Sequence, residues 1–307
     1  MLWLILLIIN QFINALVILI DKLILKTSLI QPKTYAFWVG VLSLSAFLLT
    51  PFGLRVISFN NFLLAILSGI LGMLGLLAYY WALKKYEVSK ASPAIGASLP
   101  IFIFFLNWWL LLKTLNISFL HILSLTLLIV GSVLIALKDF KSFPFRMLSL
   151  TTLTSLLMAL SVVLLKKLYL EVGFISGFVW SRLGAFFVAL CLLGTKEVKQ
   201  NVLQKSRQFF SSFKQQGLVK YVILNQILGV STAFLYNFAA YLVPVAYLPF
   251  INAFDGIKYI FLLMVVVLLS KRFPRILIEE VVGKTFYRKI IAVILIAIGI
   301  ALLYFNK

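Results

Sequence analysis

Long apolar runs alternate along the chain with short polar connections. Charged residues, prolines and asparagines interrupt the apolar pattern, and the runs between them are about 20 residues long. A transmembrane helix needs roughly 20 mainly apolar residues to cross about 30 Å of hydrocarbon. Dividing the chain at these interruptions predicts ten membrane-spanning helices, at residues 2–20, 34–54, 61–83, 92–112, 118–137, 147–168, 173–194, 218–241, 246–270 and 287–305.

Two of the predicted connections are long, residues 195–217 and 271–286. The first has apolar residues near helical spacing among Lys and Gln, which is typical of a helix lying in the membrane interface. A solvated basic loop is the alternative. The apolar positions are Val198, Val202, Phe209 and Phe213.

The composition agrees with a membrane protein. Of the 307 residues, 63% are hydrophobic and only 12% are charged, and the mean hydropathy is +1.12. These values exclude an ordinary soluble domain. We therefore predict an all-α, polytopic protein of the cell (cytoplasmic) membrane, in contact with the lipid bilayer.

The net charge of +20 results from 28 basic against 8 acidic residues. A nucleic-acid-binding protein needs an exposed basic face, whereas these residues form short clusters between apolar runs, so we expect no nucleic-acid partner. Alternate connections, together with the helix ends that flank them, hold 21 of the 28 basic residues, and the other face holds five. Because basic loops stay in the cytoplasm, the first face is predicted to be cytoplasmic and both chain ends to lie outside.

The second half of the chain repeats features of the first. Tyr86, Val88 and Ala91 align with residues 155 positions later, and Gly131 aligns with Gly299 at an offset of 168. The common order predicts two five-helix repeats, residues 1–141 and 142–307. Since each unit has an odd number of helices, the second enters the membrane from the opposite side, and such inverted repeats recur in transporters.

The third and fourth predicted helices resemble a known family. The string Ala78-Tyr79-Tyr80-Trp81-Ala82-Leu83, followed by Val88, Ala91-Ser92-Pro93 and Leu99-Pro100, is similar to the EamA-type repeat of the drug/metabolite transporter superfamily. The second half resembles it through Leu235-Tyr236-Asn237-Phe238-Ala239 and Val245-Ala246. Members often have a Gly-Glu pair where this chain has Leu112-Lys113-Thr114, and are often described with both termini inside.

The resemblance implies a secondary transporter that exports small metabolites, amino acid-like or amphipathic. We expect the protein to be a monomer or homodimer. Alternating access, with or without proton coupling, would carry the substrate. A flippase for an amphipathic or lipid-linked anionic substrate is one alternative, and a non-transporting membrane scaffold or sensor is another.

Three ionisable residues stand out because they lie about nine or ten residues into predicted helices: Arg182, Asp255 and Lys258. Each charge costs roughly 2.5 to 3.5 kcal/mol at a helix centre, so all three are functional candidates. In the functional interpretation the cations face a carboxylate or phosphate, and Asp255 meets a substrate amine or takes up a proton. In the structural interpretation Asp255 forms a buried salt bridge with Arg182 or Lys258 that locks the seventh and ninth helices together.

Uncharged polar groups form a second set of candidates for binding or coupling. Amides within the membrane often join helices, and membrane aromatics often pack or lie at the interface, so packing is the alternative for each. The selected residues are Asn14, Asn237, Asn252, Tyr79 and Tyr236.

No motif predicts an enzyme. Gly283-Lys284-Thr285 is similar to the end of a phosphate-binding loop, but Ile278 occupies the position that requires glycine. The single cysteine, Cys191, excludes a Cys-based metal site, and the one histidine, His121, lies near a helix end. We expect no catalytic residue, cofactor or bound metal.

Overall fold

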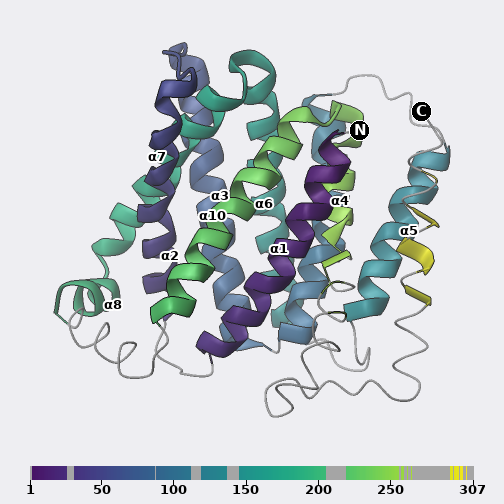
Figure 1. Ribbon diagram of the computed structural model, residues 1–307, viewed down its shortest axis with the longest axis horizontal. Coiled ribbons are helices and arrows are strands. Elements are labelled where there is room, and N and C mark those ends of the chain that lie inside the picture. The colour runs from purple at the N-terminus through teal and green to yellow at the C-terminus, as the bar shows by residue number, and fades with distance from the viewer. Residues whose placement is uncertain are drawn as a thin grey trace.

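The computed structural model describes residues 2–25, 31–86, 88–111, 119–136, 145–204 and 219–255, together with scattered positions between 257 and 302. Of this part of the chain, 93% is helical and none is strand. The long helices lie side by side in one bundle (Figure 1). The predicted all-α class is therefore confirmed for the described residues.

Eight predicted spans coincide with helices. They are α1 (Leu2–Leu25), α2 (Pro32–Leu42) with its 3-10 continuation η1 (Ser43–Phe52), α3 (Phe59–Lys85), α4 (Val88–Leu110), α5 (Phe119–Ala136), α6 (Phe145–Val172), α7 (Phe174–Leu193) and α10 (Val219–Leu242).

The ninth predicted span starts with η3 (Val245–Tyr247) and α11 (Leu248–Ala253). Most of its remainder, and most of the tenth span, lie outside the described residues. Five helical stretches are long and apolar enough to cross a membrane: Pro32–Phe52, Phe59–Lys85, Phe145–Val172, Phe174–Leu193 and Ile223–Leu242. The chain is thus a helical membrane protein, and the full set of ten spans stays a prediction.

Local sequence explains where several helices begin. Pro32 occupies the first turn of α2, where the missing N–H of proline costs nothing. The Ser58 hydroxyl accepts a hydrogen bond of 3.4 Å from the Asn61 N–H at the start of α3. Gly173 adopts φ +79° between α6 and α7, a conformation that glycine reaches without steric cost, and the chain reverses there in a single residue.

Helix α3 packs closely against α6 and α7 because glycines line its surface. A Cβ atom at Gly69 would overlap the backbone oxygen of Ser181, and one at Gly184 would overlap that of Ile66. Farther along α3, a Cβ at Gly75 would lie 2.8 Å from Cγ of Met158 in α6. The glycines of the third predicted span therefore permit close helix packing, as expected for small residues in membrane helices.

A second glycine contact joins α5 to the helical residues near position 296. A Cβ at Gly131 would lie 2.6 Å from Cγ1 of Ile296 and 2.9 Å from the Ala292 oxygen. A Cβ at Gly299 would lie 2.9 Å from Cγ of Leu128 and 3.1 Å from the Ser124 oxygen. Ala292 and Ile296 come 168 positions after Ser124 and Leu128, the same offset that separates Gly299 from Gly131.

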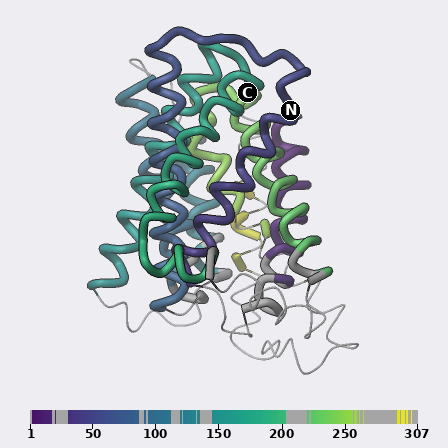
Figure 2. Tube along the Cα trace, turned by 90° about the vertical axis from the view of Figure 1, so that its left-hand side faces the viewer, coloured from purple at the N-terminus to yellow at the C-terminus, as the bar shows by residue number. Residues whose placement is uncertain are grey.

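Three of the basic connections meet at one end of the bundle. Lys33 lies 3.8 Å from Glu197, and the Lys84 ammonium donates a hydrogen bond to Gln31. At the opposite end, residues 53–58 cross the bundle (Figure 2). There the Arg55 N–H donates to the Ser176 hydroxyl at 3.0 Å, and its carbonyl accepts from the Trp180 indole at 3.0 Å.

The long connection after α7 begins with helix. Residues Lys196–Lys199 form α8 and Gln200–Gln204 form the π-helix η2. Val198 is buried against α2 and α7, with Val202 packed on the same cluster. The predicted interfacial helix is thus helical over 196–204, and its other two apolar positions, Phe209 and Phe213, lie outside the described residues.

Candidate functional site: a polar cluster between α1, α10 and α11

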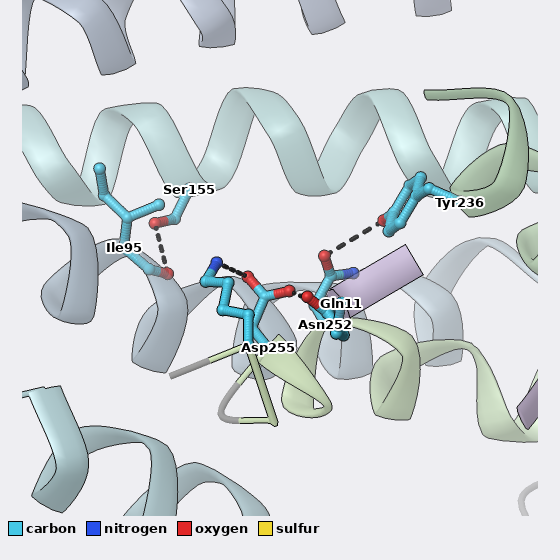
Figure 3. Close-up of polar contacts among 7 residues, drawn as sticks. Gln11, Ile95, Ser155, Tyr236, Asn252 and Asp255 are labelled. Atoms are coloured by element: carbon cyan, nitrogen blue, oxygen red, sulfur yellow. Dashed lines mark hydrogen bonds and ion pairs between the residues drawn. The ribbon is translucent and has the colours of Figure 1, made fainter. Parts of the chain in front are cut away.

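The carboxylate of Asp255 is the centre of a polar cluster among apolar helices. The Lys258 ammonium lies 2.9 Å from its Oδ2, and the Gln11 Nε2 of α1 donates a hydrogen bond of 3.0 Å to its Oδ1. The backbone turns at Phe254, directly after α11, and places Asp255 one residue beyond that turn. Asp255 and Gln11 face each other in Figure 3.

Asn252, one turn before Asp255, extends the cluster to α10. The Tyr236 hydroxyl donates a hydrogen bond of 3.1 Å to the Asn252 Oδ1. Figure 3 shows this contact beside the Asp255 carboxylate. The same view includes the Ser155 hydroxyl of α6, which donates to the Ile95 carbonyl of α4 at 3.3 Å.

Several buried polar atoms of this region have no hydrogen-bond partner among the described residues. They include the Gln11 Oε1 and the Asn252 Nδ2, whose side chains are only 1% and 5% exposed, and the Oδ1 of Asn10. A buried polar group without a partner costs about 1 to 3 kcal/mol. The cluster therefore offers both donor and acceptor capacity that the described residues do not use.

Arg182 lies in a second polar group, on α7. Its guanidinium carbon lies 4.2 Å from the centroid of the Phe178 ring, and its buried Nε has no hydrogen-bond partner among the described residues. The neighbouring Tyr169 of α6, within electrostatic range of Arg182, donates a hydrogen bond of 3.1 Å to Asn237 Oδ1. A cation over an aromatic face gains about 0.5 to 2 kcal/mol, less than the cost of a charge at a membrane helix centre.

Lys166 is a further cation inside the bundle, although the charge count from the sequence placed it among the five basic residues of the less basic face. Lys166 lies within α6, which continues through Val172, four residues beyond its predicted end, and Lys166 is only 2% exposed. Its ammonium donates to the carbonyls of Tyr241 at 2.8 Å and Val243 at 2.5 Å. These carbonyls lie at the C-terminal end of α10, where a helix leaves carbonyl acceptors unpaired and carries partial negative charge.

Asn107 of α4 holds the same connection from another side. Its Nδ2 donates a hydrogen bond of 2.7 Å to the carbonyl of Val245. The break between α10 and α11 is thus fixed by two buried side chains, and α11 directs Asn252 and Asp255 into the cluster.

The structure separates the predicted site residues into groups. Asp255, Lys258, Asn252 and Tyr236 lie in one cluster, whereas Arg182 and Asn237 lie in the Tyr169 group. Tyr79 packs in another apolar cluster, with Ala82 and Ala91, and Asn14 is half-buried on α1.

Of the two salt bridges considered for Asp255, the one to Lys258 is present and the one to Arg182 is absent. The structural interpretation required a salt bridge that locks α7 to the ninth predicted helix. Asp255 and Lys258 are three residues apart in the chain, so their pair does not form this lock. Gln11 instead links this segment to α1.

The comparisons with known proteins give information about the fold and not about the function. No protein-family profile matches the chain, and no curated protein matches it in sequence. A crystal structure described only as "Crystal structure of protein" superposes with a TM-score of 0.62 at 15% identity, over 97% of this chain and 95% of that one. Nearly the whole chain therefore shares its arrangement of helices with a solved protein.

Proposed function

We propose that the protein is a multi-pass secondary transporter of the cytoplasmic membrane. It exports small metabolites by alternating access, and its chain comprises ten spans in two inverted five-helix repeats of the EamA type. The observation that carries the proposal is the Gln11–Asp255 hydrogen bond, which joins the first predicted repeat to the second at a partly buried carboxylate. Transporters of this design bind substrate and coupling ions where two such halves meet.

The contacts of Gly131 and Gly299 support the repeat. Gly131 lies against Ala292 and Ile296, and Gly299 lies against Ser124 and Leu128. Each residue of one set is 168 positions from its equivalent in the other. This is the relationship expected of two units about a pseudo-two-fold axis, because a contact across such an axis is self-complementary.

The unused hydrogen-bonding atoms of Gln11, Asn252 and Asn10 support binding over a purely structural role. A cluster that served only to join helices would gain stability by pairing these atoms. A polar substrate supplies the donors and acceptors that these atoms do not find among the described residues. The Lys258 ammonium and the Asp255 carboxylate then separate or stay paired according to the substrate's own charge.

The test is counterflow in proteoliposomes loaded with a panel of amino acids and nucleosides, at two pH values. We expect exchange of at least one substrate by the natural protein and its loss in Asp255→Asn, with folding kept as judged by size-exclusion chromatography. Lys167→Gln is the matched control, because Lys167 is exposed on α6. A flippase would move a fluorescent anionic lipid between leaflets instead, and a scaffold would do neither.

A further inference from the structure

The charges inside the bundle do not balance. Away from the helix ends, the side chains that the structure describes include three cations, Lys166, Arg182 and Lys258, and one anion, Asp255. Lys258 pairs with Asp255, and Lys166 donates to two carbonyls at the end of α10. Arg182 alone has neither a carboxylate nor a carbonyl partner among the described residues.

The aromatic surroundings of Arg182 strengthen the attraction between its charge and an anion. Its guanidinium lies over Phe178, in a cluster of aromatic rings that includes Tyr169 and Phe174. Rings exclude water, and an ion pair formed away from water is screened less than one at the surface. The Tyr169 hydroxyl already donates to Asn237, so it does not supply a charge that neutralises Arg182.

We propose that Arg182 binds an oxyanion group, a carboxylate or a phosphate, of the transported molecule. The proposal rests on the proposed transport function and narrows its substrate to a molecule with an anionic group. A guanidinium presents parallel N–H donors that fit two oxygens of one such group, and Nε, which has no partner here, is one of those donors. Gln11, Asn252 and Asp255 are left to contact other parts of the substrate.

The position of Arg182 suits a substrate that crosses the membrane. Arg182 is eight residues after Phe174, the first residue of α7, which corresponds to about 12 Å along a helix axis. Helix α7 has 20 residues and is about 30 Å long. The cation thus lies in its middle third, too deep for an interfacial counter-ion.

The first experiment measures thermal unfolding of the purified protein in neutral detergent with phenyl phosphate or benzoate. Benzyl alcohol serves as the uncharged control compound. We expect both anions to raise the unfolding temperature by several degrees, as a ligand of the folded state does, and benzyl alcohol to have no such effect. The rise is expected to disappear in Arg182→Gln and to persist in Arg146→Gln, which removes an exposed arginine from α6. An equal rise in Arg182→Gln overturns the proposal.

A second measurement needs no variant, in case Arg182→Gln does not fold. Phenylglyoxal modifies accessible guanidinium groups, and mass spectrometry of peptides follows Arg182 and Arg146 in the same sample. We expect phenyl phosphate to slow modification of Arg182 at least threefold and to leave Arg146 unchanged. Unaltered modification of Arg182 at saturating phenyl phosphate contradicts an anion site there.

Nanodiscs identify the source of the anionic group. If discs of phosphatidylglycerol protect Arg182 and discs of phosphatidylcholine do not, the group belongs to an anionic lipid. Protection by soluble phenyl phosphate in either disc supports a soluble metabolite. Neither assay requires transport, so absence of protection together with Asp255-dependent counterflow refutes the anion site alone. Protection without any counterflow refutes transport and keeps the anion site.

Discussion

Gln11 and Asp255 are 244 residues apart in the chain, yet the side-chain amide of the first donates a 3.0 Å hydrogen bond to the carboxylate of the second. The bond connects α1 to the segment that follows α11. Asp255 therefore has two partners of different kinds, an amide from a distant helix and the Lys258 ammonium on its own segment. A change in either partner alters how strongly the carboxylate is held.

A double-mutant cycle on this pair tests the link between α1 and the Asp255 segment. Gln11→Met keeps the size of the side chain and removes the donor, and Asp255→Asn removes the charge. A hydrogen bond to a charged group contributes about 1.5 to 3 kcal/mol, so we expect a coupling free energy above about 1 kcal/mol in reversible unfolding by SDS in mixed micelles. A coupling near zero would show that the two side chains do not interact.

Hydropathy predicts most helices of this fold because the membrane imposes length and apolarity on each span. The same reasoning identified Asp255 and Lys258, since a charge inside an apolar run is rare. It did not identify Gln11 as the partner of Asp255, because no local pattern reports a contact between residues so far apart.

The lysine pair at 166 and 167 illustrates a second limit. Two adjacent lysines indicate the end of a membrane helix, yet α6 continues through Val172 and only Lys167 is exposed. The apolar residues Leu168 and Leu170 after the pair were the signal that the helix goes on. The carbonyl partners of Lys166 exist only because α10 ends beside it.

Replacement of Lys166 by methionine is expected to destabilise the break between α10 and α11. The substitution leaves the carbonyls of Tyr241 and Val243 without this donor, and an unpaired buried group costs about 1 to 3 kcal/mol. We expect a lower unfolding temperature and faster proteolysis near Val243. Lys167→Met is the control and changes neither, since Lys167 is exposed; equal effects of both variants would contradict the role of Lys166.

The charge distribution predicts the orientation of the chain. Because 21 of the 28 basic residues fall in alternate connections and the helix ends that flank them, those connections are expected in the cytoplasm. A reporter that is active only in the cytoplasm should be inactive when fused after Lys307 and active when inserted after Asn201. Activity after Lys307 would reverse the orientation without changing the helices.

The crossing of α3 and α7 provides the sharpest test of packing. An added methyl group at Gly69 would overlap the backbone oxygen of Ser181, and backbone atoms cannot move aside without separating the helices. Gly69→Ala and Gly184→Ala are each expected to lower stability by about 1 to 3 kcal/mol, the usual cost of overpacking.

Gly96→Ala on α4 is the matched control, because no heavy atom lies within 4 Å of its added Cβ. Alanine favours helix over glycine by about 1 kcal/mol, so this variant should be neutral or slightly stabilising. Thermal unfolding of the three variants in one detergent measures the difference, and a Gly69→Ala protein as stable as Gly96→Ala would mean that the two helices are not in contact at this point.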